Sequence, residues 1–215
     1  MSYDPVPSTE GSRRPIAARG NALVQKVSRA LAQTPLTPNT VSVLGVFFAI
    51  LGAVALLACP LWGALVCGFA IQLRLLCNLF DGLIAVEGGK GTPTGVLFNE
   101  VPDRLADSVL LIALGYATSL PDLGYLAALL AVGTAYIRAT GGSLGQPQDF
   151  SGPMAKQQRM ATMTFACLLT PLELTFFNTN YLLVISLWII VLLSALTCVL
   201  RLRRLSRTLR SSSNA

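Results

Sequence analysis

Six stretches of about twenty mostly apolar residues alternate with short polar segments along this chain. They cover residues 40–59, 62–86, 95–118, 121–140, 157–177 and 180–200. Each stretch is close to the roughly 20 residues that an α-helix needs to cross a hydrocarbon core about 30 Å thick. Polar side chains interrupt the second and third stretches, so these two are the least apolar. The pattern predicts an all-α, polytopic membrane protein with six transmembrane helices.

The segments outside these stretches also have distinct patterns. Residues 1–14 are polar and contain Pro and Ser, so we expect them to be disordered. Residues 15–35 place apolar side chains on one helical face and basic ones elsewhere, which predicts an amphipathic helix in the headgroup plane. The membrane domain then spans residues 36–200. The basic tail, residues 201–215, is expected to extend the last helix into the cytoplasm beside anionic headgroups.

The start of the first apolar stretch carries helix-initiating residues. Pro38 restricts Thr37 to an extended conformation. Asn39 or Thr40 is therefore expected to cap the helix that follows.

Composition and charge support a membrane location. The chain is 53% hydrophobic and 12% charged, against roughly 25% charged residues in soluble domains. With the N-terminus in the cytoplasm, none of the 16 Lys and Arg residues falls in an outer loop. This distribution predicts cytoplasmic N- and C-termini in a bacterial-type inner (plasma) membrane. We also expect no cleaved secretory signal peptide, because the first forty residues lack a compact apolar region.

The same numbers exclude several classes of function. The net charge of +6 comes from basic residues that flank the apolar stretches, and no nucleic-acid motif is present. Membrane lipids, and not nucleic acid, are therefore the expected anionic partners. The chain has no histidine, which argues against zinc hydrolase and Ser-His-Asp chemistry. Its five cysteines include no CxxC pair and are expected to be small apolar residues.

Polar side chains gather where the second and third stretches meet. Asn78 and Asp81 are three residues apart and share one helical face, while Asn99, Asp103 and Asp107 recur every four residues on the next helix. The glycine-rich segment GGKGTPTG joins the two and would let the backbone approach a ligand closely. Facing helices with oxygen-bearing side chains predict a site for a hard divalent cation.

Two other interpretations of this cluster exist. Buried polar residues can hold membrane helices together through hydrogen bonds, and Asn78 alone fits that role equally well. Intramembrane carboxylates are costly and usually functional, however, so three of them favour a ligand site. The acids could also mark a cation pathway, but they gather at one end of the predicted bundle.

The spacing of these residues resembles the signature of the CDP-alcohol phosphatidyltransferases, D-x2-D-G-x2-A-R-x8-G-x3-D-x3-D. The chain matches every interval over 26 residues, from Asn78 to Asp103. It departs at three positions, where Asn78 and Asn99 replace acidic residues and Val86 replaces an arginine. Asn keeps an oxygen ligand but removes a negative charge, so weaker metal binding is expected. Val86 cannot contact phosphate as an arginine does, and Lys90 or Arg74 is a candidate replacement.

The resemblance implies transfer of a phosphatidyl group from CDP-diacylglycerol, or another CDP-alcohol, to an alcohol acceptor, with release of CMP in phospholipid biosynthesis. It implies two divalent cations, Mg²⁺ or Mn²⁺, and a homodimer. The implied metal ligands are Asn78, Asp81, Asn99 and Asp103. Asp103 would also be the general base that takes the acceptor's proton.

The resemblance extends to positions around the metal site. Gly82 and Ala85 would leave room for the CDP group, and Gly95 would allow a close helix approach. Glu100 and Asp107 are auxiliary candidates that could restore some negative charge.

A second cluster of polar residues lies between the fourth and fifth stretches. Positive-inside charge bias alone would explain its basic residues. The segment also resembles the family's YxRA…LG…G…R pattern, carried here by Tyr136, Arg138, Ala139, Leu144, Gly145, Gly152 and Arg159. This pattern implies that Arg138 and Arg159, with Lys156 nearby, bind the phosphate of a phosphorylated acceptor.

Two functions from other classes compete with the enzyme. A non-catalytic lipid- or nucleotide-binding relative would explain the departures at Asn78, Val86 and Asn99, and would bind CDP-diacylglycerol without releasing CMP. An ion-coupled transporter would explain acids inside the membrane, and Asp81→Asn would abolish its solute flux. The sequence does not identify the acceptor alcohol.

Overall fold

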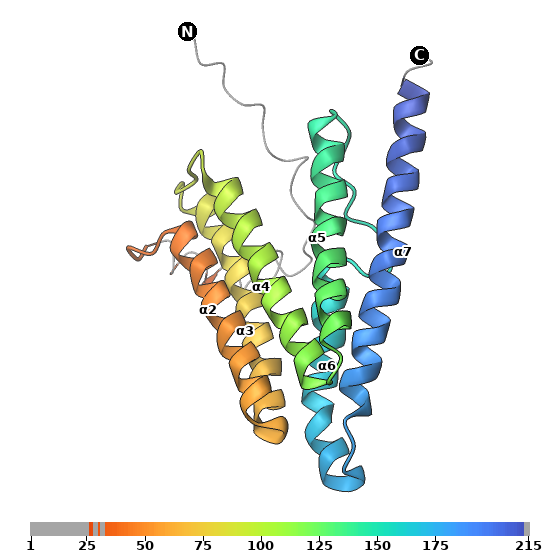
Figure 1. The fold of residues 1–215 in the computed structure, drawn as a ribbon. Helices are drawn as coiled ribbons and strands as arrows, with labels where there is room; N and C mark the ends of the chain where they lie inside the picture. Colours follow the sequence, from red (N-terminus) through yellow and green to blue (C-terminus); the bar gives the residue numbers. More distant parts are fainter. Residues whose placement is uncertain (1–25, 28–29, 31–32, 213–215) are drawn as a thin grey trace.

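The computed structural model describes residues 26–27, 30 and 33–212 of the chain. Long helices and no strands form this described part (Figure 1), which confirms the all-α prediction. The helices are α2 (Pro38–Ala58), α3 (Pro60–Glu87), α4 (Gly95–Ala117), α5 (Pro121–Ser143), α6 (Lys156–Phe177) and α7 (Tyr181–Ser212). The interfacial helix predicted for residues 15–35 lies mostly outside the described residues.

Within the described residues, five helices are long and apolar enough to cross a membrane. The sixth, α4, has a similar length but carries Glu100, Asp103 and Arg104 near its start. It packs between α2 and α5 in the same bundle. Many large apolar side chains, such as Phe47, Phe69 and Leu129, are exposed on the outside of the helices, as lipid contact requires. The chain is thus a multi-pass membrane protein.

Helix α2 begins at Pro38, two residues earlier than a cap at Asn39 would allow. Thr37 is extended, with φ −97° and ψ 152°, and its hydroxyl accepts a hydrogen bond from the backbone N–H of Thr40. Pro38 occupies the first helical position, where its missing N–H costs nothing. The cap is therefore Thr37, and neither Asn39 nor Thr40.

The helices form two groups of three, α2–α4 and α5–α7 (Figure 1). The groups meet where α4 packs on α5 and α3 packs on α6. A Cβ at Gly115 would lie 2.6 Å from the Cα of Gly124, so only glycine lets α4 and α5 approach this closely. The shared core is apolar and includes Ile71, Leu110 and Met163. This packing brings the polar ends of α3, α4, α5 and α6 together.

The turn between α6 and α7 is fixed by a buried carboxylate. Glu173 accepts hydrogen bonds from the backbone N–H groups of Tyr181 at 2.6 Å and Leu182 at 3.0 Å. It also accepts from the hydroxyl of Thr179 at 2.8 Å. The first N–H groups of a helix lack partners within the helix, so Glu173 acts as the N-terminal cap of α7.

Glu173→Ala is expected to destabilise the protein by about 1–2 kcal/mol, because it removes this cap. Thermal unfolding of the purified protein in detergent, followed by circular dichroism, measures the effect. Asp122→Ala is the matched control, since Asp122 is an exposed acid in the first turn of α5. Equal losses in the two variants would contradict the capping role.

Candidate functional site

The polar ends of the helices surround one cavity of about 650 Å³. All six described helices contribute to its wall, including Ser42 from α2 and Arg201 from α7. Of the twelve site residues predicted from the sequence, all except Asp107 line it. Those lining residues are Asn78, Asp81, Gly82, Ala85, Gly95, Asn99, Glu100, Asp103, Arg138, Lys156 and Arg159.

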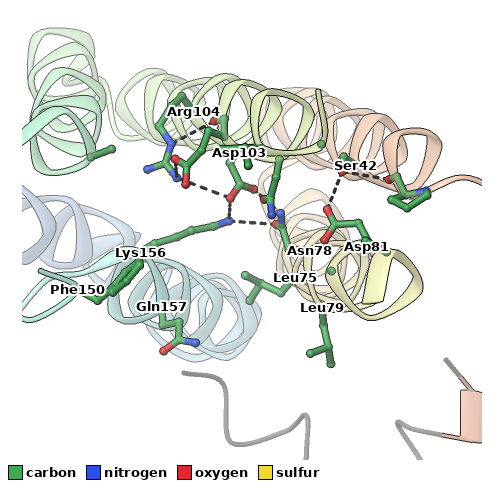
Figure 2. Close-up of a pocket in the computed structure, with 18 of the residues that line it drawn as sticks. Ser42, Leu75, Asn78, Leu79, Asp81, Asp103, Arg104, Phe150, Lys156 and Gln157 are labelled. Atoms are coloured by element: carbon green, nitrogen blue, oxygen red, sulfur yellow. Dashed lines mark hydrogen bonds and ion pairs between the residues drawn. The ribbon is translucent and has the colours of Figure 1, made fainter. Parts of the chain in front are cut away.

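Three of the predicted residues form a closed group of hydrogen bonds. The Nζ of Lys156 donates to the Oδ1 of Asn78 at 3.1 Å and also to the Oδ2 of Asp103. The amide nitrogen of Asn78 donates to the other oxygen of Asp103. Figure 2 shows Lys156 reaching from α6 to the two side chains on α3 and α4. A cation of the protein itself thus lies between two predicted metal ligands.

Asp81 lies on the other side of Asn78 (Figure 2). Its Oδ2 accepts a hydrogen bond from the hydroxyl of Ser42 at 2.7 Å. Its Oδ1 is buried and has no hydrogen-bond partner among the described residues. An unsatisfied buried carboxylate oxygen is costly, so this atom is suited to a cationic ligand.

Asn99 and Glu100 differ in their surroundings. Asn99 is exposed and lines the cavity. Glu100 forms an ion pair with Arg138 at 2.6 Å and a weaker one with Arg104 at 3.5 Å. Its charge therefore offsets neighbouring arginines, and the predicted auxiliary role at a metal has no support from these contacts.

Asp107 lies behind the cavity wall, between two buried arginines. Its Oδ1 accepts from Arg74 at 2.6 Å, and its Oδ2 accepts from Arg159 at 3.3 Å. Arg74 also donates to Asp103, to the carboxylate at 3.3 Å and to the backbone carbonyl at 3.2 Å. Asp107 is thus a structural centre that links α3, α4 and α6.

The two candidate replacements for the missing arginine at position 86 lie in different surroundings. Arg74 is 1% exposed and does not line the cavity, because Asp103 and Asp107 hold it in the interior. Lys90 lines the cavity and donates to the backbone carbonyls of Thr34 and Leu36. Of the two, Lys90 is the one placed to meet a ligand.

Space for a ligand exists at the predicted glycines. A Cβ at Gly95 would meet only the hydroxyl of Thr92, at an ordinary 3.6 Å. The predicted close helix approach at Gly95 is therefore wrong, since no neighbouring helix lies against this position in the described residues. Gly82 and Ala85 line the same side of the cavity from α3.

The predicted acceptor-binding arginines lie near the loop between α5 and α6. Arg138 donates to Gln148 and lies 5.1 Å from the centre of the Phe150 ring. Arg159 donates to the backbone carbonyl of Met154 at 3.0 Å, and its Nε has no partner among the described residues. The loop therefore holds both arginines at the cavity, while Tyr136 and Leu144 of the same pattern are largely exposed.

The glycines of this pattern have a conformational role. Gly145 and Gly152 have φ of +76° and +127°, which other residues rarely adopt. A Cβ at Gly152 would also lie 2.5 Å from a methyl group of Thr197 on α7. The two glycines therefore set the path of the loop.

Sequence patterns missed Arg201, which holds the loop from α7. Arg201 donates to the backbone carbonyls of Ser151 at 2.8 Å and Thr134 at 2.7 Å. Burial alone would raise the pKa of Asp149 in this loop. Hydrogen bonds from Ser151 and the charges of Arg201 and nearby Arg204 outweigh it, so the pKa lies below its usual value. The only signal for Arg201 was its place at the end of the last apolar stretch.

The donor set fits a divalent cation in part. Asp81 offers an unsatisfied carboxylate oxygen, and Asn99 offers an amide oxygen from the facing helix. The oxygens of Asn78 and Asp103 already accept hydrogen bonds from Lys156. The Asp81 side therefore suits a hard cation, whereas the Asp103 side holds an ammonium.

Comparison with known proteins identified relatives along most of the chain. No family model matches it. It is 28% identical over 191 residues to a phosphatidylinositol phosphate synthase of Mycolicibacterium smegmatis, covering 83% of this chain and 82% of that protein. This identity and coverage support the resemblance to the CDP-alcohol phosphatidyltransferases that the signature residues indicate.

Solved structures share the fold. The phosphatidylinositol phosphate synthase of Mycobacterium tuberculosis with bound CDP-DAG superposes with a TM-score of 0.72 and 22% identity, covering 86% of this chain and 94% of that one. The same enzyme in complex with manganese and citrate gives a TM-score of 0.71 at 22% identity, covering 85% and 88%. The described helices thus have the arrangement of that membrane enzyme.

Proposed function

We propose that this chain is a CDP-alcohol phosphatidyltransferase that moves a phosphatidyl group from CDP-diacylglycerol to an alcohol acceptor and releases CMP. One observation carries the proposal. The residues of the variant signature, except Val86, line the same cavity as the two arginines of the second pattern, which lie far from them in the sequence. A transfer between two phosphate-bearing molecules requires that one cavity binds both molecules side by side.

The reaction requires one bond to form and one to break. The acceptor hydroxyl attacks the phosphorus of the phosphatidyl group, and the bond from that phosphorus to the CMP oxygen breaks. Asp103 lines the cavity and takes the hydroxyl proton. Lys156 and Arg74 contact the Asp103 carboxylate and fix its orientation.

A bound Mg²⁺ or Mn²⁺ would neutralise the diphosphate charge of the donor. Asp81 and Asn99 are the residues of this chain that would hold it. Support comes from the buried, unsatisfied oxygen of Asp81 and from the manganese complex of the mycobacterial enzyme. Gly82, Ala85 and Gly95 leave room beside this position for the CDP group.

The acceptor is proposed to carry its own phosphate. Arg138, Arg159 and Arg201 line the cavity together, and guanidinium groups bind phosphate through paired hydrogen bonds. The relatives named phosphatidylinositol phosphate synthase suggest an inositol phosphate as this acceptor. The membrane is proposed to be a bacterial inner membrane, with both termini cytoplasmic and the protein as a homodimer.

A CMP-release assay tests the function. Purified protein with CDP-diacylglycerol and Mg²⁺ or Mn²⁺ is expected to release CMP with a phosphorylated alcohol, and to release much less with unphosphorylated inositol, glycerol or serine. Chelation of divalent ions with EDTA is expected to abolish release, and added Mn²⁺ to restore it. Binding of CDP-diacylglycerol without CMP release for any acceptor would instead indicate a non-catalytic lipid-binding relative.

A further inference from the structure

Lys156 places a fixed positive charge where two of the four implied metal ligands meet. Its Nζ donates to Asn78 on α3 and to Asp103 on α4. The side chain is 11% exposed, and the carboxylate of Asp103 is 10% exposed. This is a partly buried ion pair inside the cavity, and not a lysine that extends into solvent.

Asn78 is suited to this lysine in a way that an aspartate would not be. Its amide nitrogen donates to the Oδ1 of Asp103, while its amide oxygen accepts from Lys156. A carboxylate at position 78 has no donor and would face the carboxylate of Asp103 directly, so a further cation would be needed between them. The replacement of an acid by Asn78 and the position of Lys156 are therefore consistent with each other.

The charge at the four signature positions leads to the same conclusion. Asp81 and Asp103 supply two negative charges, because Asn78 and Asn99 are neutral. Two divalent ions would bring four positive charges to these two carboxylates, next to Lys156 and Arg74. Cation affinity depends on the number of charged ligands. One divalent ion together with the ammonium leaves a smaller excess of positive charge, which the diphosphate of the donor can offset.

We propose that the ammonium of Lys156 takes the place of one of the two divalent cations that the signature implies. The chain then binds a single divalent ion, on the Asp81 side of Asn78. Asp81 keeps a buried oxygen without a partner among the described residues, whereas both oxygens of Asp103 accept hydrogen bonds. The proposal rests on the proposed function, and it makes Lys156 a residue that positions Asp103.

Counting bound Mn²⁺ tests the proposal without reference to turnover. The full chain, purified in detergent and stripped of metal, is titrated with Mn²⁺, and free ion is followed by electron paramagnetic resonance. We expect one Mn²⁺ per chain for the wild type and none for Asp81→Asn. Two ions, or none, in the wild type would overturn the proposal, and so would a bound ion retained in Asp81→Asn.

A double variant tests the replacement itself. Asn78→Asp combined with Lys156→Met restores an acid and removes the ammonium, so we expect two Mn²⁺ per chain. Lys90→Met is the matched control, because Lys90 lines the same cavity but donates to loop carbonyls, and it should keep one ion. A double variant that folds and still binds one ion would contradict the proposal. If the double variant does not fold, the wild-type count still decides.

The two proposals fail in different ways. If the wild type releases CMP but binds two Mn²⁺, the proposed function is supported and the role of Lys156 is contradicted. If the wild type binds one Mn²⁺ but releases no CMP, the ion count is supported and the proposed function is contradicted.

Discussion

Asp103→Asn is expected to lower CMP release by about 10²–10⁴-fold, because the amide cannot take the proton of the acceptor hydroxyl. The substitution keeps the size of the side chain and keeps an oxygen for Lys156. Turnover per molecule of folded protein, measured at saturating CDP-diacylglycerol, reports the effect. Binding of CDP-diacylglycerol should change far less than turnover, since the proton acceptor acts in the transition state.

Asp122→Asn is the matched control for this substitution. Asp122 lies in the first turn of α5, at the opposite end of that helix from Arg138. It does not line the cavity, and the control should retain wild-type turnover. An Asp103→Asn protein with turnover within about twofold of the wild type would show that another group is the base.

Asp107→Asn is expected to cause the largest loss of stability, about 3–5 kcal/mol. Asp107 is 1% exposed and is the carboxylate shared by Arg74 and Arg159, which are 1% and 0% exposed. Removing its charge leaves two buried guanidinium groups without full compensation. Thermal unfolding of Asp107→Asn and of the wild type, at the same detergent concentration, measures the loss.

Asp149→Asn is the control for the buried pair. Asp149 forms a 3.5 Å ion pair with Arg204, and both side chains are substantially exposed. Exposed pairs contribute little because water screens them. The amide oxygen of an asparagine can still accept the hydrogen bonds from Ser151, so this variant should unfold close to the wild-type temperature. A similar shift for Asp107→Asn and Asp149→Asn would show that the buried cluster does not hold the helices together.

Apolar periodicity was enough to predict the fold. Each predicted stretch corresponds to one helix, from α2 to α7, with ends displaced by a few residues. Helix α7 continues beyond the apolar stretch through residues 201–212, where the basic tail was expected to extend the last helix. Apolar side chains are needed only within the hydrocarbon core, whereas the backbone hydrogen bonds of the helix can continue beyond it.

Except for Asp107, sequence spacing also predicted which residues of α3 and α4 share the cavity, because helical periodicity fixes the face of each side chain. Spacing could not predict the partner of each charge. Lys156 is 78 positions from Asn78 and contacts it only because α6 packs on α3. Arg74 was a candidate for phosphate contact, yet its helical face directs it to Asp107 in the interior. Such pairings depend on the tertiary packing of helices and not on local pattern.

The bonds of Arg201 have a consequence for how the protein is made. The chain is synthesised from the N-terminus, so the loop near Ser151 leaves the ribosome well before Arg201 does. The carbonyls of Ser151 and Thr134 gain their Arg201 donors only after the last helix has been inserted. A nascent chain that stops before residue 201 lacks these donors and cannot complete this wall of the cavity. Completion of the cavity is thus coupled to the insertion of α7.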